Sequence, residues 1–333
     1  MQYNSKVTAF CAFYKRADVA ERTLKSISKQ SYKDMTALVW DDCSDDNTYS
    51  SLLKSKSLLN DERIIVFQNK ENIGITASFN EALKRCSSEY IAIIGSGDEC
   101  APERISKQVA YLEKHSDAAF CACKSITVDE VTGKLFKDES HNNTLITHKD
   151  IIDTVPFTHG TVVYRRSSIE NVGGFEPIFK WCADWDLLLR ILNSGHGVFL
   201  DETLYTRYAR LDGVSFNPDK SLEQIQYKYL AKHLDSDKKN RNRSIAEAKE
   251  NLLLSLRKYH PEISKDLEKR ACKLALMGRT AESKSLVHLT DRSFGKSILR
   301  SIKVKTCIAL NKTKINPDHL INISRKITNR KRQ

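Results

Sequence analysis

Hydrophobic and polar positions follow two alternating periods in the first third of the chain. Short apolar runs predict strands at residues 6–14, 35–40, 63–68 and 90–94. Between these runs, apolar side chains three or four positions apart predict helices at residues 18–30 and 75–86 and another after Pro102. Strands and helices that alternate in this way indicate a parallel sheet with right-handed crossovers. The pattern therefore predicts an α/β domain.

The pattern continues and then changes character. Further strands are expected at residues 119–127 and 161–165, followed by a helix at 183–193. Beyond Lys220 only amphipathic helices are expected, near residues 222–230, 245–256, 263–274, 281–289 and 294–309. We therefore expect one α/β domain at residues 1–219 and a separate all-α region at residues 220–333.

The run YIAIIGSGDECAP at residues 90–102 places a carboxylate at a special position. The buried strand at 90–94 is followed by a Gly-Ser-Gly turn and then by Asp98. In α/β sheets, ligands bind at the carboxyl ends of the strands. A carboxylate there can hold a divalent cation and, through it, a diphosphate. The same pattern also fits a plain turn whose Asp caps the next helix.

Charge and cysteine content narrow the class of protein. The chain of 333 residues carries a net charge of +12, and its nine cysteines have no metal-ligand spacing, so they are expected to be reduced thiols. No apolar run is long enough for a membrane span or a signal peptide. From Lys220 onward, 28 Lys and Arg face 11 Asp and Glu, a balance of +17. These features predict a cytoplasmic protein with a strongly basic C-terminal region.

Four co-linear runs resemble a known family. They are ERTLKSISKQSYKDMTALVWDDCSDDNT, NIGITASFNEAL, EYIAIIGSGDE and NVGGFEPIFKWCADWDLLLRI, within residues 5–215. The chain resembles the family 2 glycosyltransferases, which are inverting enzymes of the GT-A fold, a Rossmann-like, mostly parallel sheet flanked by helices. The resemblance implies transfer of a sugar from a nucleotide-diphosphate sugar, expected to be a UDP-sugar. The implied acceptor is a hydroxyl of a glycan or a lipid-linked glycan, as in cell-surface polysaccharide synthesis.

The resemblance also implies a set of donor-binding residues. These are Ala12, Tyr14, Asp41, Asp42, Gly97 and Asp98. An aromatic ring such as Tyr14 can stack on a nucleotide base, although it also suits core packing. A carboxylate such as Asp42 can accept hydrogen bonds from a base N–H or a sugar hydroxyl. Asp42 fits equally well as a turn acid that caps a helix.

The sequence departs from the family pattern in the central loop. Gly95 and Gly97 stand where family members commonly carry two acids, so only Asp98 is left to hold a divalent cation, Mn²⁺ or Mg²⁺. Arg210 occupies the place of a histidine that binds metal in many members. A cation in that place could contact the diphosphate directly.

By resemblance, Asp184 in the run ADWD is the general base. The chemistry needs such a group, because the acceptor hydroxyl must lose its proton as it attacks the anomeric carbon. Asp186 is a rival for this role, and first-turn acids are also common for structural reasons. His159 and Trp181 are expected on the acceptor side, where His159 also fits a buried structural histidine.

Two alternatives concern the C-terminal charges and the activity itself. The basic region is either a solvated surface or a docking surface for an anionic membrane that carries a lipid-linked acceptor. Nucleic acid is not expected as a partner, because aromatic residues are sparse among the charges and no recognition motif is present. The alternative to an enzyme is a catalytically silent nucleotide-sugar or glycan-binding module, which the glycines at 95 and 97 would suit.

Overall fold

The computed structural model describes residues 3–137, 144–210, 217–252, 256, 260–289 and 304–308. The chain forms two compact units, Met1–Ala209 and Arg210–Gln333, which are described separately. The domain boundary expected from composition, after residue 219, stays a prediction.

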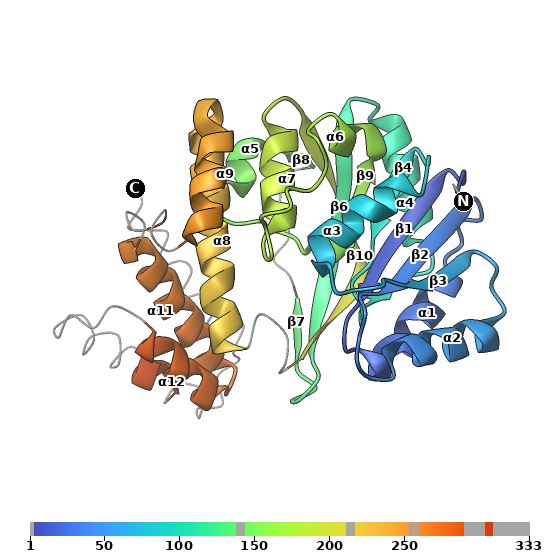
Figure 1. The fold of residues 1–333 in the computed structure, drawn as a ribbon. Helices are drawn as coiled ribbons and strands as arrows, with labels where there is room; N and C mark the ends of the chain where they lie inside the picture. The colour runs from blue at the N-terminus through green and yellow to red at the C-terminus, as the bar shows by residue number, and fades with distance from the viewer. Residues whose placement is uncertain are drawn as a thin grey trace. The chain divides into compact units, whose positions relative to one another are not determined.

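Four parallel strands form one half of the sheet in the first unit (Figure 1). They are β1 (Val7–Phe13), β2 (Met35–Asp41), β3 (Ile64–Gln68) and β4 (Tyr90–Ile93), in the order β3-β2-β1-β4. Nearly all residues of β1 and β4 are buried, as the continuous apolar runs predict for strands covered on both faces. All four carboxyl ends therefore meet at the same edge of the sheet.

Helices cover both faces of this half. A 3-10 turn, η1 (Ala17–Val19), leads into α1 (Ala20–Ser28), which is followed by α2 (Thr48–Leu59), α3 (Gly74–Lys84) and α4 (Arg104–Lys114). Apolar side chains of α1, α2 and α4 join the core formed with one face of β1. On the opposite face, Phe79 of α3 packs against Phe10 and Trp40, with ring centroids 6.2 and 5.8 Å apart. The side chains of β1 alternate between the two faces, which explains this division.

The other half of the sheet is mixed. It contains β5 (Glu99–Cys100), β6 (Ala118–Asp129), β9 (Val163–Arg165) and β10 (His196–Ala209), and two short strands, β7 (Leu135–Lys137) and β8 (Leu145–Ile146), attach to β6 and β10. β9 runs antiparallel to both β4 and β6, whereas β10 runs parallel to β6. The expected mostly parallel sheet is confirmed, but the strand alternation alone does not reveal the antiparallel β9 or the presence of β10.

Shorter helices connect these strands. They are α5 (His148–Ile151), the 3-10 turn η2 (His159–Thr161), α6 (Arg166–Glu170) and α7 (Ala183–Leu192). α7 buries Leu188, Leu189 and Leu192, as its periodicity predicts. Its first turn carries the acids of the ADWD run.

The described residues of the second unit form helices. These are α8 (Pro218–Ser236), the 3-10 turn η3 (Lys238–Asn240), α9 (Arg241–Glu250), α11 (His260–Leu276) and α12 (Thr280–His288). Leu230 of α8 and Leu267 and Ala271 of α11 are buried. The segment expected at residues 294–309 lies largely outside the described residues. No helix in the described part of the chain is long and apolar enough to span a membrane.

Candidate functional site

The carboxyl edge of the parallel strands brings the expected donor residues together. Ala12 is paired with Trp40 across β1 and β2, and the N–H of Asp42 donates to the carbonyl of Phe13 at 2.8 Å. Tyr14, just beyond β1, is 46 % exposed, so its ring is available for stacking rather than committed to the core.

Asp41 organises the turn after β2. Its side chain is fully buried and accepts hydrogen bonds from the N–H of Ser44 at 3.0 Å and from Nε2 of Gln68 at 2.8 Å. The hydroxyl of Ser44 also donates to it. These bonds fix the backbone at the donor edge, and a direct contact of Asp41 with the donor stays a prediction.

Asp42 caps helix α3. Its carboxylate accepts the backbone N–H groups of Ile73 at 3.1 Å and Gly74 at 2.9 Å, and it accepts Nδ2 of Asn69 at 2.8 Å. These are donors that the start of a helix otherwise leaves without partners. The capping role that the sequence left open is therefore present, and it serves α3 rather than α2. Asp42 is 4 % exposed, and its contact with the donor stays a prediction.

Asp98 is held by two donors from β10. The hydroxyl of Tyr205 donates to Oδ2 at 2.7 Å, and the backbone N–H of Tyr208 donates to Oδ1 at 2.9 Å. Burial raises the pKa of the Asp98 carboxyl to about 6, although both hydrogen bonds act in the opposite direction. The carboxylate is thus fixed in orientation by a strand far away in the sequence.

The two glycines of the Asp98 loop, Gly95 and Gly97, are required for different physical reasons. Gly97 has a φ of +93°, a conformation that side chains with a Cβ rarely adopt. At Gly95, an added Cβ would lie 2.4 Å from Oδ2 of Asp98. With Asp98 in this orientation, an acid at position 95 would collide with the carboxylate, so the departure from the family pattern is built into the loop.

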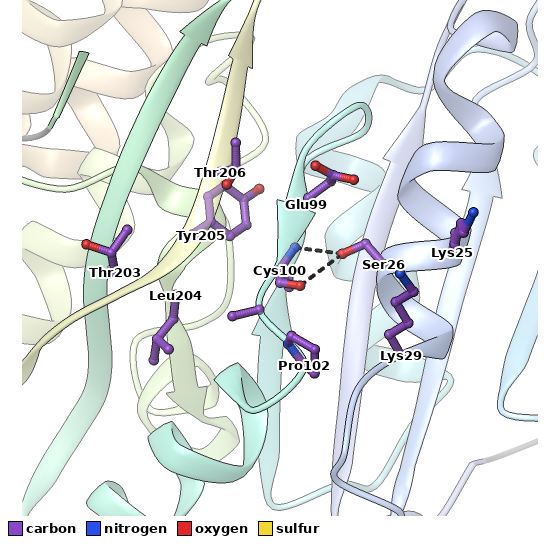
Figure 2. Close-up of a pocket in the computed structure, with 11 residues that line it drawn as sticks. Lys25, Ser26, Lys29, Glu99, Cys100, Pro102, Thr203, Leu204, Tyr205 and Thr206 are labelled. Atoms are coloured by element: carbon purple, nitrogen blue, oxygen red, sulfur yellow. Dashed lines mark hydrogen bonds between the residues drawn. The ribbon is translucent and has the colours of Figure 1, made fainter. Parts of the chain in front are cut away.

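A cavity of about 430 Å³ lies between α1, β5 and β10 (Figure 2). Its wall includes Lys25 and Lys29 of α1 and Thr203 and Tyr205 of β10. None of the site residues expected from the sequence lines it. The cavity therefore lies beside the Asp98 loop without forming the site itself.

In α7, the described residues leave one acid of the expected site without a partner. Asp184 is half-buried in the first turn of α7, and its carboxylate makes no hydrogen bond or ion pair with any residue that the structure describes. Cys182, directly before the helix, adopts the left-handed conformation with a φ of 60°. For a residue other than glycine this conformation costs free energy and is found mostly where a site requires it.

Asp186, the rival base, is committed to the protein. Its side chain is fully buried and accepts Nε of Arg190 at 2.9 Å, with Nη2 of the same residue at 2.8 Å. A fully buried carboxylate that is held by a guanidinium is out of hydrogen-bond reach of a substrate hydroxyl. The two acids of the ADWD run thus have different surroundings, which favour Asp184.

Two buried polar atoms lie near Asp184. Nε2 of His159 and Oη of Tyr164 are enclosed and have no hydrogen-bond partner among the described residues. Burial lowers the pKa of His159, and the nearby Asp184 charge opposes this shift, whereas burial and the same charge both raise the pKa of Tyr164. The imidazole is therefore neutral near pH 7. Its ring packs against Phe79 and Phe175, with centroid distances of 5.9 and 6.1 Å.

Comparison with known proteins assigns the chain to a family. Residues 8–173 match the family described as Glycosyl transferase family 2. The putative glycosyltransferase EpsE of Bacillus subtilis (strain 168) is 30 % identical over 210 residues, which are 62 % of this chain and 73 % of EpsE. The chain belongs to glycosyltransferase family 2.

A second relative and two solved structures are also similar to this chain. The Escherichia coli protein named UDP-Glc:alpha-D-GlcNAc-diphosphoundecaprenol beta-1,3-glucosyltransferase WfaP is 27 % identical, over 68 % of this chain and 86 % of WfaP. Staphylococcus aureus TarS 1-349 in complex with UDP-GlcNAc superposes with a TM-score of 0.55 and 17 % identity, covering 96 % of this chain and 92 % of TarS 1-349.

The mannosyltransferase PcManGT from Pyrobaculum calidifontis, in complex with GDP-Man and Mn²⁺, also has a TM-score of 0.55, at 16 % identity, over 93 % and 89 % of the two chains. The expected GT-A fold is confirmed by these structural likenesses.

The family raises the question of a divalent cation. Among the described residues no three His, Cys, Asp or Glu side chains gather as a metal site. Of the three loop positions where the family commonly carries acids, only position 98 has one here. Each oxygen of Asp98 keeps a free lone pair, because each accepts one of the two hydrogen bonds from β10. Such a group fits a cation that is held jointly by one carboxylate and the phosphates of a donor, as is common for Mg²⁺.

The remaining predicted site residues of this family 2 chain have less defined surroundings. Trp181 is half-buried, and Nζ of Lys180 lies 5.7 Å from the centroid of its ring. Arg210 is the first residue of the second unit, so its contact with the diphosphate stays a prediction. Sequence reasoning missed Tyr205 and Tyr208, which hold Asp98. The aromatic and β-branched run LYTRYA was a usable strand signal there.

Proposed function

We propose that this family 2 glycosyltransferase inverts the configuration of the sugar that it transfers from a UDP-sugar to a hydroxyl of a glycan or lipid-linked glycan. The observation that carries the proposal is the contrast within α7. Asp184 is half-exposed and without a partner in the described structure, whereas Asp186 is buried against Arg190. A UDP-sugar donor is supported by WfaP, which is named for UDP-Glc, and by TarS, which is in complex with UDP-GlcNAc.

The donor side uses the carboxyl edge of the sheet. Tyr14 offers an exposed ring for the base, and the turns held by Asp41 and Asp42 shape the edge beside it. Asp98 would hold a divalent cation, Mn²⁺ or Mg²⁺, whose charge stabilises the diphosphate leaving group. The residues of the chain thereby bind and orient the diphosphate at the end of β4.

The acceptor side supplies the base. The acceptor oxygen forms a bond to the anomeric carbon while the bond from that carbon to the diphosphate oxygen breaks, and the proton of the hydroxyl passes to Asp184. Attack from the face opposite the diphosphate inverts the anomeric configuration. His159, neutral and beside Asp184, offers no cation that would compete for the carboxylate. This keeps Asp184 free to accept the proton.

A membrane location on the cytoplasmic face is part of the proposal. The region from Lys220 onward carries a balance of +17, and the relative WfaP is named for an acceptor on diphosphoundecaprenol. Lys and Arg near an anionic membrane surface each contribute about 1 kcal/mol to binding. The basic region would thus bring the enzyme to a lipid-linked acceptor.

A catalytically silent binding module is the second candidate. It is favoured by the Asp98 loop, where Gly95 and Gly97 remove two acids and both oxygens of Asp98 already accept hydrogen bonds. Such a protein would bind a nucleotide sugar without cleaving it.

A screen of UDP-sugars separates the two candidates. The full chain is incubated with single UDP-sugars, with Mn²⁺, with Mg²⁺ or with a chelator, and the release of UDP is measured. We expect UDP release for one donor, lost in the Asp184→Asn variant although that variant still binds UDP. Binding of a UDP-sugar without any UDP release, even with polysaccharide or lipid-linked acceptors added, would support the silent module.

A further inference from the structure

Tyr205 occupies a fully buried position on β10, beside the short strand β5 (Figure 2). Its hydroxyl accepts the backbone N–H of Gly95 at 2.9 Å and donates to Oδ2 of Asp98 at 2.7 Å. The direction of both bonds is fixed, because an amide N–H can only donate and a carboxylate can only accept. The hydroxyl therefore ties the end of β4 to the acid that follows it.

Two glycines form a slot for this hydroxyl. A Cβ added to Gly160 would lie 2.1 Å from Oη of Tyr205, and one added to Gly95 would lie 3.1 Å from it. The backbone of Gly160 is not in the left-handed region, so its conformation does not require a glycine. The close approach of the Tyr205 hydroxyl does require one, because it leaves no room for a Cβ. The slot joins the Asp98 loop to the turn η2, which carries His159.

A buried cation fixes both walls of the slot. Arg104 is fully buried and donates to the carbonyls of Ile93 at 2.9 Å and Gly160 at 2.6 Å. The centre of its guanidinium lies 5.3 Å from the centroid of the Tyr205 ring. Burying a guanidinium is costly unless its donors are satisfied, so these bonds make the walls of the slot rigid.

We infer that Tyr205 is a positioning residue, which orients the Asp98 carboxylate so that its free lone pairs face a divalent cation and the donor diphosphate. The inference rests on the proposed function. With one acid where the family commonly has three, orientation of that acid must come from its neighbours. Hydrogen-bond partners of a metal-binding carboxylate typically contribute 10- to 100-fold to metal affinity or activity.

The test is binding rather than turnover. Calorimetry measures the affinity of the full chain for UDP with Mn²⁺ and with a chelator. Tyr205→Phe keeps the ring in the slot but removes the donor to Asp98, so we expect the Mn²⁺-dependent part of UDP affinity to fall 10- to 100-fold. Tyr90→Phe is the matched control, because it removes the hydroxyl of another fully buried tyrosine, which accepts from Arg165 at 3.2 Å and lies at the start of β4.

A double-mutant cycle separates positioning from general weakening of the fold. In the Asp98→Asn background, Tyr205→Phe should lower Mn²⁺-dependent affinity no further, since its effect acts through Asp98. Gly160→Ala, whose new Cβ displaces the Tyr205 hydroxyl, gives a second variant that should reproduce the loss if Tyr205→Phe does not fold.

The outcomes distinguish this inference from the proposed function. If the parent protein binds no UDP under any condition, the proposed function fails. If the parent binds UDP with Mn²⁺ dependence and Tyr205→Phe binds equally well, the positioning role is overturned while the function stands. Equal affinity of the parent with Mn²⁺ and with chelator overturns it too, as do additive losses in the cycle.

Discussion

The carboxylates at the two ends of the candidate site differ in their hydrogen bonding. At the end of β4, Asp98 is clamped by the hydroxyl of Tyr205 and the N–H of Tyr208, and burial raises its pKa to about 6. At the start of α7, Asp184 has no hydrogen bond within the described structure and stands beside the enclosed polar atoms of His159 and Tyr164.

The difference indicates different tasks. A group that holds a cation or a phosphate must keep one orientation, and fixed donors from a neighbouring strand provide it. A group that accepts a proton must instead keep a free lone pair within reach of the substrate. The comparison predicts that substitutions at Asp98 act mainly on binding, whereas those at Asp184 act mainly on turnover.

The largest effect is expected for the turnover rate of the Asp184→Asn variant. Asp184→Asn keeps the shape of the side chain but removes its basicity, and removal of a general base typically lowers the rate by about 10²- to 10⁴-fold. UDP affinity and thermal stability should stay close to those of the parent, because the carboxylate has no partner in the described protein. Steady-state UDP release and calorimetry measure the two quantities.

Asp186→Asn is the matched control in the same helix turn. It disrupts a buried ion pair with Arg190, so it should lower the free energy of unfolding by up to about 3–5 kcal/mol. The turnover of the folded fraction should change little. If Asp186→Asn loses turnover and Asp184→Asn keeps full activity, the general base is Asp186 rather than Asp184.

The second prediction concerns pH and Asp98. Its pKa in the folded protein, about 6, lies above the ordinary value of 3.8. The folded state thus binds the proton more tightly than the unfolded state does. The contribution of the protonated Asp98 carboxyl to the free energy of unfolding is fully present below about pH 4 and is lost as the pH rises through about 6.

In chelator, the parent should therefore lose up to about 3 kcal/mol of unfolding free energy relative to Asp98→Asn between pH 4 and pH 7. Urea unfolding at several pH values measures this difference. A difference between the two proteins that does not vary with pH would be evidence against a raised pKa of the Asp98 carboxyl in the folded protein.

A third prediction tests the cap of α3. Asp42→Ala leaves the N–H groups of Ile73 and Gly74 without their acceptor, which should cost about 1–2 kcal/mol of stability. Asp45→Ala, at an exposed acid in the same loop paired with Lys15, should leave the stability close to that of the parent. Equal stability of the two variants would contradict the cap. If UDP affinity of Asp42→Ala is unchanged, the predicted donor contact is wrong.

The smallest effect per residue is expected in the basic C-terminal region. Arg330→Gln, Lys331→Gln and Arg332→Gln should each weaken binding to vesicles that contain phosphatidylglycerol by about 1 kcal/mol. Binding to pure phosphatidylcholine vesicles should not change, and added salt should reduce the difference. If the triple variant and the parent sediment equally with both kinds of vesicle, these charges belong to a solvated surface.

Much of the fold could be predicted from the sequence, since its first four strands are short and continuously apolar. β10 could not, because Asp201 and Glu202 interrupt its apolar pattern and its register to β6 shifts at that point. The antiparallel β9 was also hidden, as a three-residue strand carries no sign of its direction.

The candidate site was predictable only as far as local pattern reaches. Asp98 and Asp184 stand out by their places at a strand end and a helix start. The clamp on Asp98 comes from Tyr205, 107 residues away, and the cap of α3 comes from Asp42, 32 residues before Gly74. Such partners depend on strand order, which no local spacing encodes. Asp186 and Arg190 are four residues apart in one helix, a spacing at which an acid and a base commonly pair. This ion pair could therefore have been predicted from the sequence.

The anomeric configuration of the first product tests the central claim most directly. Proton NMR can follow the sugar released or transferred from an α-linked UDP-sugar before mutarotation mixes the anomers. A single displacement with Asp184 as the base predicts that the β anomer appears first and that Asp184→Asn forms it at least about 10²-fold more slowly. Initial formation of the α anomer, or a parent rate in Asp184→Asn, would contradict the account.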